Sequence, residues 1–270
     1  DVSENWDDLS PKVSLEYRWN ENLMTYLSAS KGYKSGGFNG RPSHQLAAEK
    51  PFDPEYVWSY ELGLKSEFFE RRLIINAATF FNNYKDIQLV YVGATPDGQF
   101  ASFIDNAARG EVKGFELELT AAPTTDFHIV AGVGYIDAKY KKVDPNTTSA
   151  ITTSSEFNKT PEWSYSLGLQ YSLALSSAGK LVFRSDYSYR DDVQNTPDNI
   201  QALAQDGFGL LSATVTYHST DERWDLSLFG TNLEDERYVT NGISVVDTFG
   251  TVDASYGRPR EWGLRLNYNF

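Results

Sequence analysis

Apolar and polar residues alternate strictly through most of this 270-residue chain. Between residues 163 and 175, Trp, Tyr and Leu hold every second position, and Ser, Gly, Gln and Ala fill the positions between them. The last residues repeat the pattern: Trp262, Leu264, Leu266, Tyr268 and Phe270 alternate with Gly, Arg and Asn. A period of two is typical of a strand with one apolar and one polar face. The pattern therefore predicts an all-β protein.

The predicted strands are long. About eleven can be marked out by their alternation, several of them roughly 10 to 15 residues long, whereas strands of soluble proteins average about five or six. A tilted strand crosses a bilayer in about 9 to 11 residues. No strong helical pattern appears, and the sequence holds no run of 18 apolar residues that would predict a membrane-spanning helix. Strand length therefore favours a membrane sheet.

The connections between predicted strands alternate between short and long. The short ones are residues 20–22, 69–72, 123–126, 176–179 and 219–223. The long ones are roughly residues 34–54, 93–108, 141–160, 194–207 and 240–258. Short turns on one side and long loops on the other describe outer-membrane barrels. We therefore predict an antiparallel up-and-down transmembrane β-barrel. A soluble β-sandwich with a solvated charged face is the alternative, and it gives no reason for this alternation of lengths.

One face of the predicted sheet carries many charges. The residues concerned are Glu116, Glu118, Arg184, Asp186, Arg190 and Arg265. Burying such groups without partners costs several kcal/mol each, and the other face is too apolar and too long to leave in water. Both constraints are satisfied if the apolar side chains face lipid and the charged ones face a hydrated interior. We therefore expect these six residues to line a lumen.

Composition narrows the possible functions. The net charge of −13 disfavours nucleic acid as a partner, because phosphate backbones are bound through clustered Lys and Arg. The chain has no Cys, and none of its three histidines, His44, His128 and His218, has partners at metal-site spacing. Serine-hydrolase elbows, HExxH and phosphate-binding loops are absent as well. We therefore expect no enzyme activity, no cofactor and no metal site.

Five motifs follow one another in an order that resembles one known family. They are SKGYKSGGFNG at 30–40, PEYVWSYELGLKSEF at 54–68, NAARGEVKGFELE at 106–118, FGTNLEDERY at 229–238 and GRPREWGLRLNYNF at 257–270. Together they are similar to the barrel strands of TonB-dependent outer-membrane receptors of the siderophore or iron-complex type. The resemblance extends over essentially the whole chain.

This resemblance implies a barrel of roughly 22 strands whose lumen holds a plug domain. Residues 1–270 would be the C-terminal half of such a barrel, with the plug and the first half of the barrel outside this stretch. As an incomplete barrel, the chain should form a curved sheet with two free edges.

The resemblance also implies a function and partners. A receptor of this family binds a scarce ligand, most often a ferric siderophore, at its extracellular loops, and the TonB complex energises uptake through the plug. Oligosaccharides, plant-derived aromatics and cobalamin remain open as ligands, with haem a minor alternative. Outer-membrane lipid, lipopolysaccharide and the barrel-assembly machinery are further expected partners in a Gram-negative outer membrane. A passive porin is the second candidate function, and a barrel enzyme the third.

Two groups of residues are candidates for specific roles. Ligand contacts are expected in the long loops, where aromatic and Arg side chains lose little entropy on binding: Lys34, Phe38, Asn39, Arg41, Phe100, Phe103, Phe249, Tyr256 and Arg258. The C-terminal residues Trp262, Leu264, Leu266, Tyr268 and Phe270 resemble the signal that the barrel-assembly machinery reads, and an alternating edge strand suits docking by strand addition.

Overall fold

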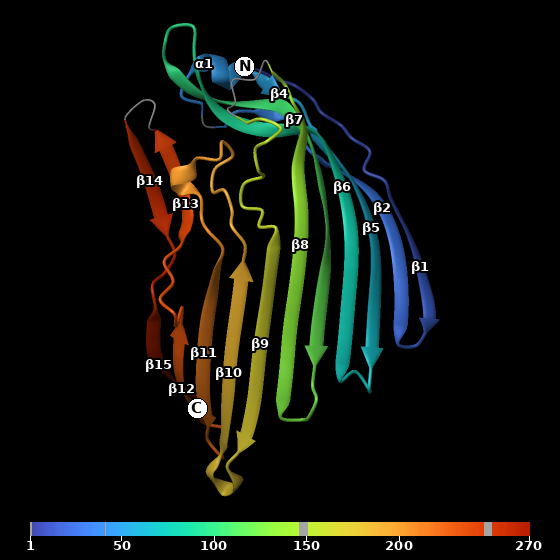
Figure 1. Cartoon of the computed structure of the whole chain (residues 1–270), viewed down its shortest axis with the longest axis vertical. Coiled ribbons are helices and arrows are strands. Elements are labelled where there is room, and N and C mark those ends of the chain that lie inside the picture. The colour runs from blue at the N-terminus through green and yellow to red at the C-terminus, as the bar shows by residue number, and fades with distance from the viewer. Residues whose placement is uncertain (1, 41, 146–150, 246–249) are drawn as a thin grey trace.

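Eleven antiparallel strands form one sheet in which each strand pairs with its neighbours along the chain (Figure 1). The computed structural model describes residues 2–40, 42–145, 151–245 and 250–270. The strands are β1 (Lys12–Asn20), β2 (Leu23–Lys34), β5 (Glu55–Phe68), β6 (Leu73–Ala94), β7 (Phe100–Ala121), β8 (Phe127–Val143), β9 (Trp163–Ala174), β10 (Lys180–Arg190), β11 (Phe208–His218), β12 (Trp224–Thr231) and β15 (Glu261–Tyr268).

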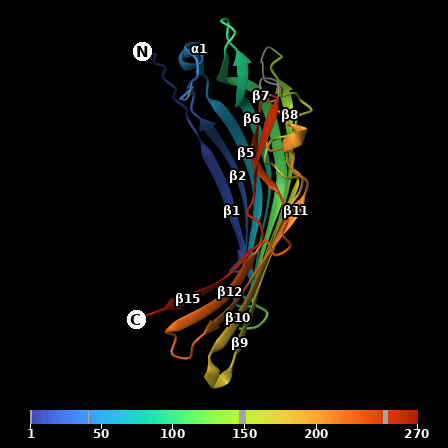
Figure 2. The ribbon, with the colours of Figure 1, turned by 90° about the vertical axis from the view of Figure 1, so that its left-hand side faces the viewer.

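The sheet is curved and does not close (Figure 2). Among the described residues, β1 pairs only with β2 and β15 pairs only with β12, so the two outer strands each keep one free edge. The prediction of an all-β, up-and-down antiparallel sheet of about eleven strands with two free edges is confirmed. No helix in the described part of the chain is long and apolar enough to span a membrane.

Connections of different length lie at opposite ends of the sheet (Figure 1). The long connections, with their small elements, lie at what we call the loop end, and the short ones lie at the turn end. The small elements are β3 (Gly37–Phe38), β4 (Pro51–Phe52), β13 (Val239–Val245), β14 (Thr251–Tyr256), the helix α1 (Gln45–Glu49) and the 3-10 turn η2 (Gln201–Leu203). A second 3-10 turn, η1 (Ser176–Ala178), forms the short connection between β9 and β10.

The predicted loop 93–108 is wrong. Strand β6 continues to Ala94 and β7 begins at Phe100, so only residues 95–99 connect them. Gly98 has a φ of 80°, a left-handed conformation that favours glycine, and its N–H donates to the Thr95 carbonyl oxygen at 2.9 Å. The pairing of β6 with β7 shifts register between Tyr84 and Gln88. The larger part of the error lies at the start of β7, where the register shifts against β6 near Ala108 and against β8 between Arg109 and Gly110, so the alternation is broken there and the sequence pattern starts the strand too late.

Strand register divides the sheet into an apolar and a polar face. Directly paired residues project to the same face, so one row across β9, β10, β11, β12 and β15 consists of Tyr171, Phe183, Val215, Leu228 and Leu264. The adjacent row on the opposite face begins with Gln170, Arg184 and Thr214. On the apolar face, Leu228 is 52% exposed and Leu264 is 68% exposed. Such a surface requires an apolar environment outside the chain.

The buried core lies at the loop end of the sheet, where β6, β7 and β8 meet the β8–β9 connection. Buried residues Ile87, Leu89, Ala107, Ala108, Tyr140 and Ile151 form one cluster, against which Tyr84, Val143 and Phe157 pack. These residues come from β6, β7, β8 and the β8–β9 connection. The loop end is therefore the part of the described chain that the chain itself packs most tightly.

Candidate ligand-binding site at the loop end

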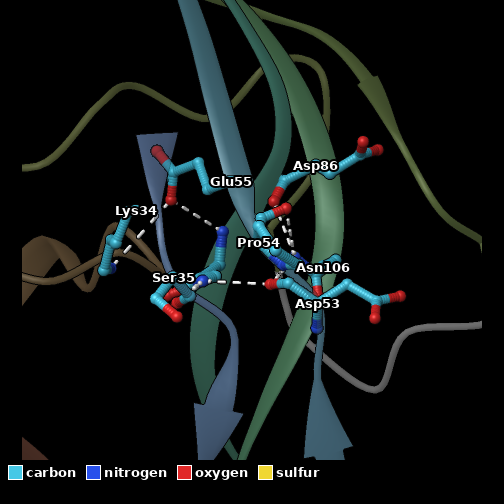
Figure 3. Close-up of polar contacts among 8 residues, drawn as sticks. Lys34, Ser35, Asp53, Pro54, Glu55, Asp86 and Asn106 are labelled. Atoms are coloured by element: carbon cyan, nitrogen blue, oxygen red, sulfur yellow. Dashed lines mark hydrogen bonds and ion pairs between the residues drawn. The ribbon is translucent and has the colours of Figure 1, made fainter. Parts of the chain in front are cut away.

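A network of hydrogen bonds fixes the base of the β2–β5 connection (Figure 3). The Asn106 amide on β7 donates to the carbonyl oxygens of Asp53 at 2.7 Å and Asp86 at 2.8 Å. Its own oxygen accepts from the Asp53 N–H at 2.7 Å. The Gln88 amide on β6 donates to the carbonyl oxygens of Ser35 and Asp53 at 2.9 and 3.0 Å. We call these five residues the rim network.

The rim network satisfies backbone groups that the sheet leaves unpaired. Ser35 and Asp53 lie just beyond the paired ends of β2 and β5, and Asp86 lies in the irregular stretch of β6 with a φ of 56°. Glu55 extends the network by accepting the Gln88 N–H at 3.0 Å, and the Lys34 ammonium lies 4.0 Å from the same carboxylate. These amides supply partners for backbone groups beyond the strand ends, and in this way they hold the connection at a defined place on the rim.

Further contacts attach the same connection to the β6–β7 hairpin. The Asn39 amide donates to the Ser102 carbonyl oxygen at 2.6 Å, and Lys50 pairs with Asp105. His44 accepts the Leu46 N–H at the start of α1, and its other ring nitrogen lies 3.2 Å from Asp97. The hydrogen bond from the Thr95 hydroxyl lowers the pKa of the Asp97 carboxyl, and the contact with His44 lowers it further.

The β8–β9 connection folds onto the sheet at the loop end. Phe157 stacks on Tyr140 with ring centroids 4.2 Å apart and an interplanar angle of 18°. Gly110 on β7 pairs with Tyr140 and leaves space for the Phe157 ring, because a Cβ at position 110 would lie 2.7 Å from Phe157 Cζ. The NAARGEVKGFELE motif therefore contains two residues that organise loops: Asn106 and Gly110.

Gly110→Val is expected to displace the β8–β9 connection. Its side chain would occupy the space of the Phe157 ring and of Ile87 Cδ1, which lies 3.2 Å from the ideal Cβ. Overpacking of this kind costs about 1 to 3 kcal/mol. Limited proteolysis of the full-length protein should show faster cleavage between residues 151 and 162. Gly132→Ala is the control because its Cβ would lie 3.2 Å from Ser166 Oγ and 4.0 Å from the Leu117 carbonyl oxygen, with no aromatic ring in its way. Equal cleavage in both variants would contradict the role of Gly110.

The β10–β11 connection packs against the β13–β14 hairpin. Leu203 in η2 is fully buried, and a Cβ at Gly242 on β13 would lie 2.3 Å from Leu203 Cδ2. Phe208 stacks on Tyr238 with ring centroids 4.4 Å apart. Four long connections, as well as the β6–β7 hairpin, are thus held by specific contacts, and together they form a structured surface above the sheet.

The structure places the candidate ligand residues at the loop end but in different environments. Phe38 packs edge-on against Trp6, and Asn39 uses its amide to hold β7. Phe103 is partly buried in β7. Tyr256 lies in β14 beneath the Arg237 guanidinium, which is 4.2 Å from its ring centroid. The backbone of Phe100 belongs to β7, but its side chain, Arg41 and Phe249 lie outside the described residues.

Lys34 and Arg258 are the most accessible of the candidates, with side chains 66% and 86% exposed. Arg258 lies 3.6 Å from Glu261. Within the described ranges, no group of three or more His, Asp or Glu side chains is arranged to hold a metal ion. The chemistry that this surface offers is therefore hydrogen bonding, charge and aromatic contact with a ligand from outside.

Comparison with known proteins gives a consistent result. A family model described as "TonB dependent receptor-like, beta-barrel" matches residues 1–233. The chain belongs to the TonB-dependent receptor β-barrel family. Members of this family are receptors of the Gram-negative outer membrane and serve transport.

Curated relatives align with most of the chain. The metal-pseudopaline receptor CntO of Pseudomonas aeruginosa strain UCBPP-PA14 is 24% identical over 97% of this chain and 33% of its own length. The pesticin receptor of Yersinia pestis is 28% identical over 88% of this chain and 33% of its own. The crystal structure of the ferric yersiniabactin uptake receptor FyuA from Yersinia pestis aligns with a TM-score of 0.80 at 22% identity, over 96% of this chain and 37% of that one. The chain spans about a third of the length of the curated relatives it matches.

The six charged residues predicted for the lumen of this receptor barrel share the polar face. Register connects Glu118 with Ser166 through Gly132, and Glu116 with Arg190 through Gly134 and Ser164. Arg184 donates two hydrogen bonds to Asp186, at 2.8 and 2.7 Å. Arg190 lies over the Phe208 ring at 4.4 Å, and Arg265 lies over the Phe229 ring at 5.3 Å. The three arginines therefore have partners on their own face.

The candidate assembly residues of this receptor chain form the free edge strand β15. Trp262, Leu264 and Leu266 are 76%, 68% and 67% exposed, and the Phe270 ring packs edge-on against Tyr268 with centroids 5.1 Å apart. An exposed, alternating strand with one unpaired edge is suited to docking by strand addition.

Deleting Phe270 from the full-length receptor is expected to lower its level in the outer membrane severalfold, because the edge strand loses its terminal aromatic. The measurement is the amount of receptor in outer-membrane fractions relative to an unrelated barrel. Phe69→Ala is the control, since Phe69 is 68% exposed but lies in the β5–β6 turn. An unchanged level of receptor in the outer membrane after deletion of Phe270 would contradict the role of Phe270 in assembly.

Sequence reasoning missed the residues that shape the loop end. Asn106, Gln88 and Gly110 lie inside strands, and each acts on a loop distant in sequence. Asn and Gly in the middle of a strand are disfavoured by strand propensity. The presence of Asn106 and Gly110 in the middle of a strand was therefore the feature of the sequence that could have indicated their role in holding the loops.

Proposed function

We propose that this chain forms the C-terminal half of the barrel of an outer-membrane receptor for TonB-energised uptake of a ferric siderophore or similar iron complex. The observation that carries the proposal is the structured loop end. There the rim network holds the β2–β5 connection, and contacts of Phe157 and Leu203 hold other long connections, while short turns occupy the other end. A passive channel needs no such surface. The names of the relatives, which include a metal-pseudopaline receptor and a ferric yersiniabactin uptake receptor, support the same ligand class.

In this proposal the two faces of the sheet have different surroundings. The apolar face meets lipid, where alternating Leu, Tyr, Phe and Trp are favoured. The polar face, with Glu116, Glu118, Arg184, Asp186, Arg190 and Arg265, lines the lumen. TonB acts through a plug domain inside the completed barrel, so this chain supplies wall and loops and has no catalytic role. Lys34, Phe103, Tyr256 and Arg258 are proposed to contribute to the ligand surface.

Iron uptake in whole cells tests this function. A strain lacking the full-length gene should lose growth on one member of a panel of ferric siderophores, and the restored gene should recover it. Uptake of that radiolabelled complex should collapse when a protonophore removes the proton motive force. Uptake that persists under the protonophore would favour a porin, and growth loss only on oligosaccharides or cobalamin would overturn the proposed ligand class.

A further inference from the structure

Arg190 lies at the loop end of the polar face without an acidic partner among the described residues. It is the last residue of β10, which runs toward the loop end (Figure 1), and its side chain is partly buried. Arg184, six residues earlier on the same face, donates two hydrogen bonds to Asp186. No described carboxylate oxygen lies within 4.0 Å of the Arg190 guanidinium. Charged side chains that are partly removed from water generally have a counter-charge, so Arg190 is an exception that calls for one.

Aromatic rings hold the Arg190 guanidinium in place. Its Cζ lies 4.4 Å from the ring centroid of Phe208, its partner in register on β11, and 5.8 Å from the ring centroid of Tyr238. The two rings are stacked with centroids 4.4 Å apart, and Phe208 is only 6% exposed. A ring face attracts the plane of a guanidinium but does not occupy the N–H donors at its edge. This edge is therefore held in a defined orientation and remains able to bind a planar anion.

Two sequence motifs build the support for these rings. Tyr238 ends the FGTNLEDERY motif, and Gly257 opens the GRPREWGLRLNYNF motif. A Cβ at position 257 would overlap the Tyr238 ring, so glycine is needed there to leave space for it. The Gly257 N–H donates to the Tyr238 carbonyl oxygen at 2.9 Å. The next residue, Val239, donates its N–H to Gln205 Oε1 at 2.6 Å, which fixes the start of β13 to the β10–β11 connection.

The acidic residues around this site do not neutralise Arg190. Asp191 accepts a hydrogen bond from the Tyr189 hydroxyl at 3.4 Å. Glu116 belongs to the same row as Arg190 but lies three strands away, about 14 Å. The other carboxylates of the neighbouring connections make no ion pair with Arg190 in the described chain: Glu162, Asp192, Asp198, Asp206, Glu234, Asp235, Glu236 and Glu261. These carboxylates repel an anion at a distance, so anion binding here depends on direct contact with the guanidinium edge.

We propose that Arg190 binds an anionic oxygen pair of the iron complex, from a carboxylate or a catecholate, as the ligand enters the lumen from the loop end. This inference rests on the proposed receptor function and adds the charge of the ligand to it. The guanidinium fork matches two neighbouring anionic oxygens, which an uncharged or cationic hydroxamate complex does not offer with the same charge. Phe208 and Tyr238 are positioning residues, because they act through Arg190.

Equilibrium binding to the purified full-length receptor tests the assignment of Arg190. The probes are four ferric complexes: an anionic tris-catecholate, anionic citrate, an uncharged trihydroxamate and a trihydroxamate with a free ammonium group. Wild type should bind at least one anionic complex about tenfold or more tightly than both hydroxamates. Arg190→Gln should bind that complex about tenfold or more weakly than wild type, because a charged bidentate contact is lost. Arg190→Lys should fall between the two, since it keeps the charge but not the planar fork.

Arg184→Gln is the matched control, because Arg184 lies on the same strand and face but already donates to Asp186; it should bind like wild type. Gly257→Ala should weaken binding of the anionic complex by less than Arg190→Gln, because it displaces Tyr238 and leaves the charge of Arg190 in place. Wild-type affinity in Arg190→Gln, or equal weakening in Arg184→Gln, would overturn the role of Arg190 and leave the receptor function standing.

The choice of ligand decides the rest of the inference. A preference for either hydroxamate complex, or binding of none of the four probes, would overturn the anionic ligand class. The proposed function itself fails only by the separate growth test, when loss of the full-length gene impairs growth on no ferric siderophore.

Discussion

Arginine in place of Leu167 is expected to destabilise the folded receptor by about 2 to 4 kcal/mol, the cost of an arginine on the lipid face near the bilayer midplane. Leu167 lies on the apolar face in the middle of β9, where it pairs with Ala131 and Tyr187, and its side chain is 41% exposed. The measurement is the urea concentration at which full-length receptor unfolds in lipid vesicles, together with its level in the outer membrane.

The neighbouring residue supplies the control. Ser166 is on the polar face, between Gly132 and Ser188, and this row continues to Glu118 on β7. Arginine at position 166 would have open space above the glycine and a carboxylate within reach, so Ser166→Arg should change stability by less than about 1 kcal/mol. Equal destabilisation by both substitutions would mean that the faces are not divided between lipid and lumen.

Asn106→Asp is expected to disrupt the loop end more than Asn106→Ala. The aspartate keeps an acceptor for the Asp53 N–H but places a negative oxygen against the carbonyl oxygens of Asp53 and Asp86, where the amide now donates. Alanine only leaves these groups without partners. Hydrogen bonds contribute about 1 kcal/mol each, and unsatisfied or repelling polar groups cost about 1 to 3 kcal/mol. Alanine should therefore cost about 2 to 3 kcal/mol locally, and aspartate more.

Amide hydrogen exchange measures this local destabilisation in the β2–β5 connection itself. Amides of residues 35–40 and 42–53 should exchange faster in Asn106→Ala and fastest in Asn106→Asp, and ligand affinity should fall in the same order. Asn76→Asp is the control, since the Asn76 amide makes a single long contact, 3.5 Å from Glu118, at the turn end. The reverse order of the two Asn106 variants would contradict the donor role of the amide.

Much of the fold could be predicted because alternation and connection length follow directly from the environment of a membrane sheet. The strand from Trp163 to Ala174 and the final strand from Glu261 to Tyr268 match the apolar–polar pattern almost residue for residue. The charges at Glu118 and Arg184 identified the polar face for the same reason. Each of these features depends on a residue and its neighbours two positions away.

The arrangement of the loop end could not be predicted in this way. The Asn106 side chain acts on residues 53 and 86, and Gly110 accommodates a ring from residue 157. Such contacts depend on register across several strands, and the shift near Asp86 hides that register from the sequence pattern. The five-residue helix α1 is too short to produce a helical period. The position of Asn39 in a long connection predicts a ligand contact but gives no sign of the hydrogen bond that its amide donates to Ser102 on β7.

The two outer strands of the sheet, each paired on one side only among the described residues, determine how this polypeptide can exist in a bilayer. Along β1 and β15, every second residue points an N–H and a C=O away from the sheet, and hydrocarbon provides no partner for them. Eleven strands inserted alone would therefore recruit whatever backbone is nearby, including a second copy of themselves. Supplying the complementary strands as a separate polypeptide should convert such aggregates into a closed wall, so the receptor is a candidate for reconstitution from two separately expressed pieces.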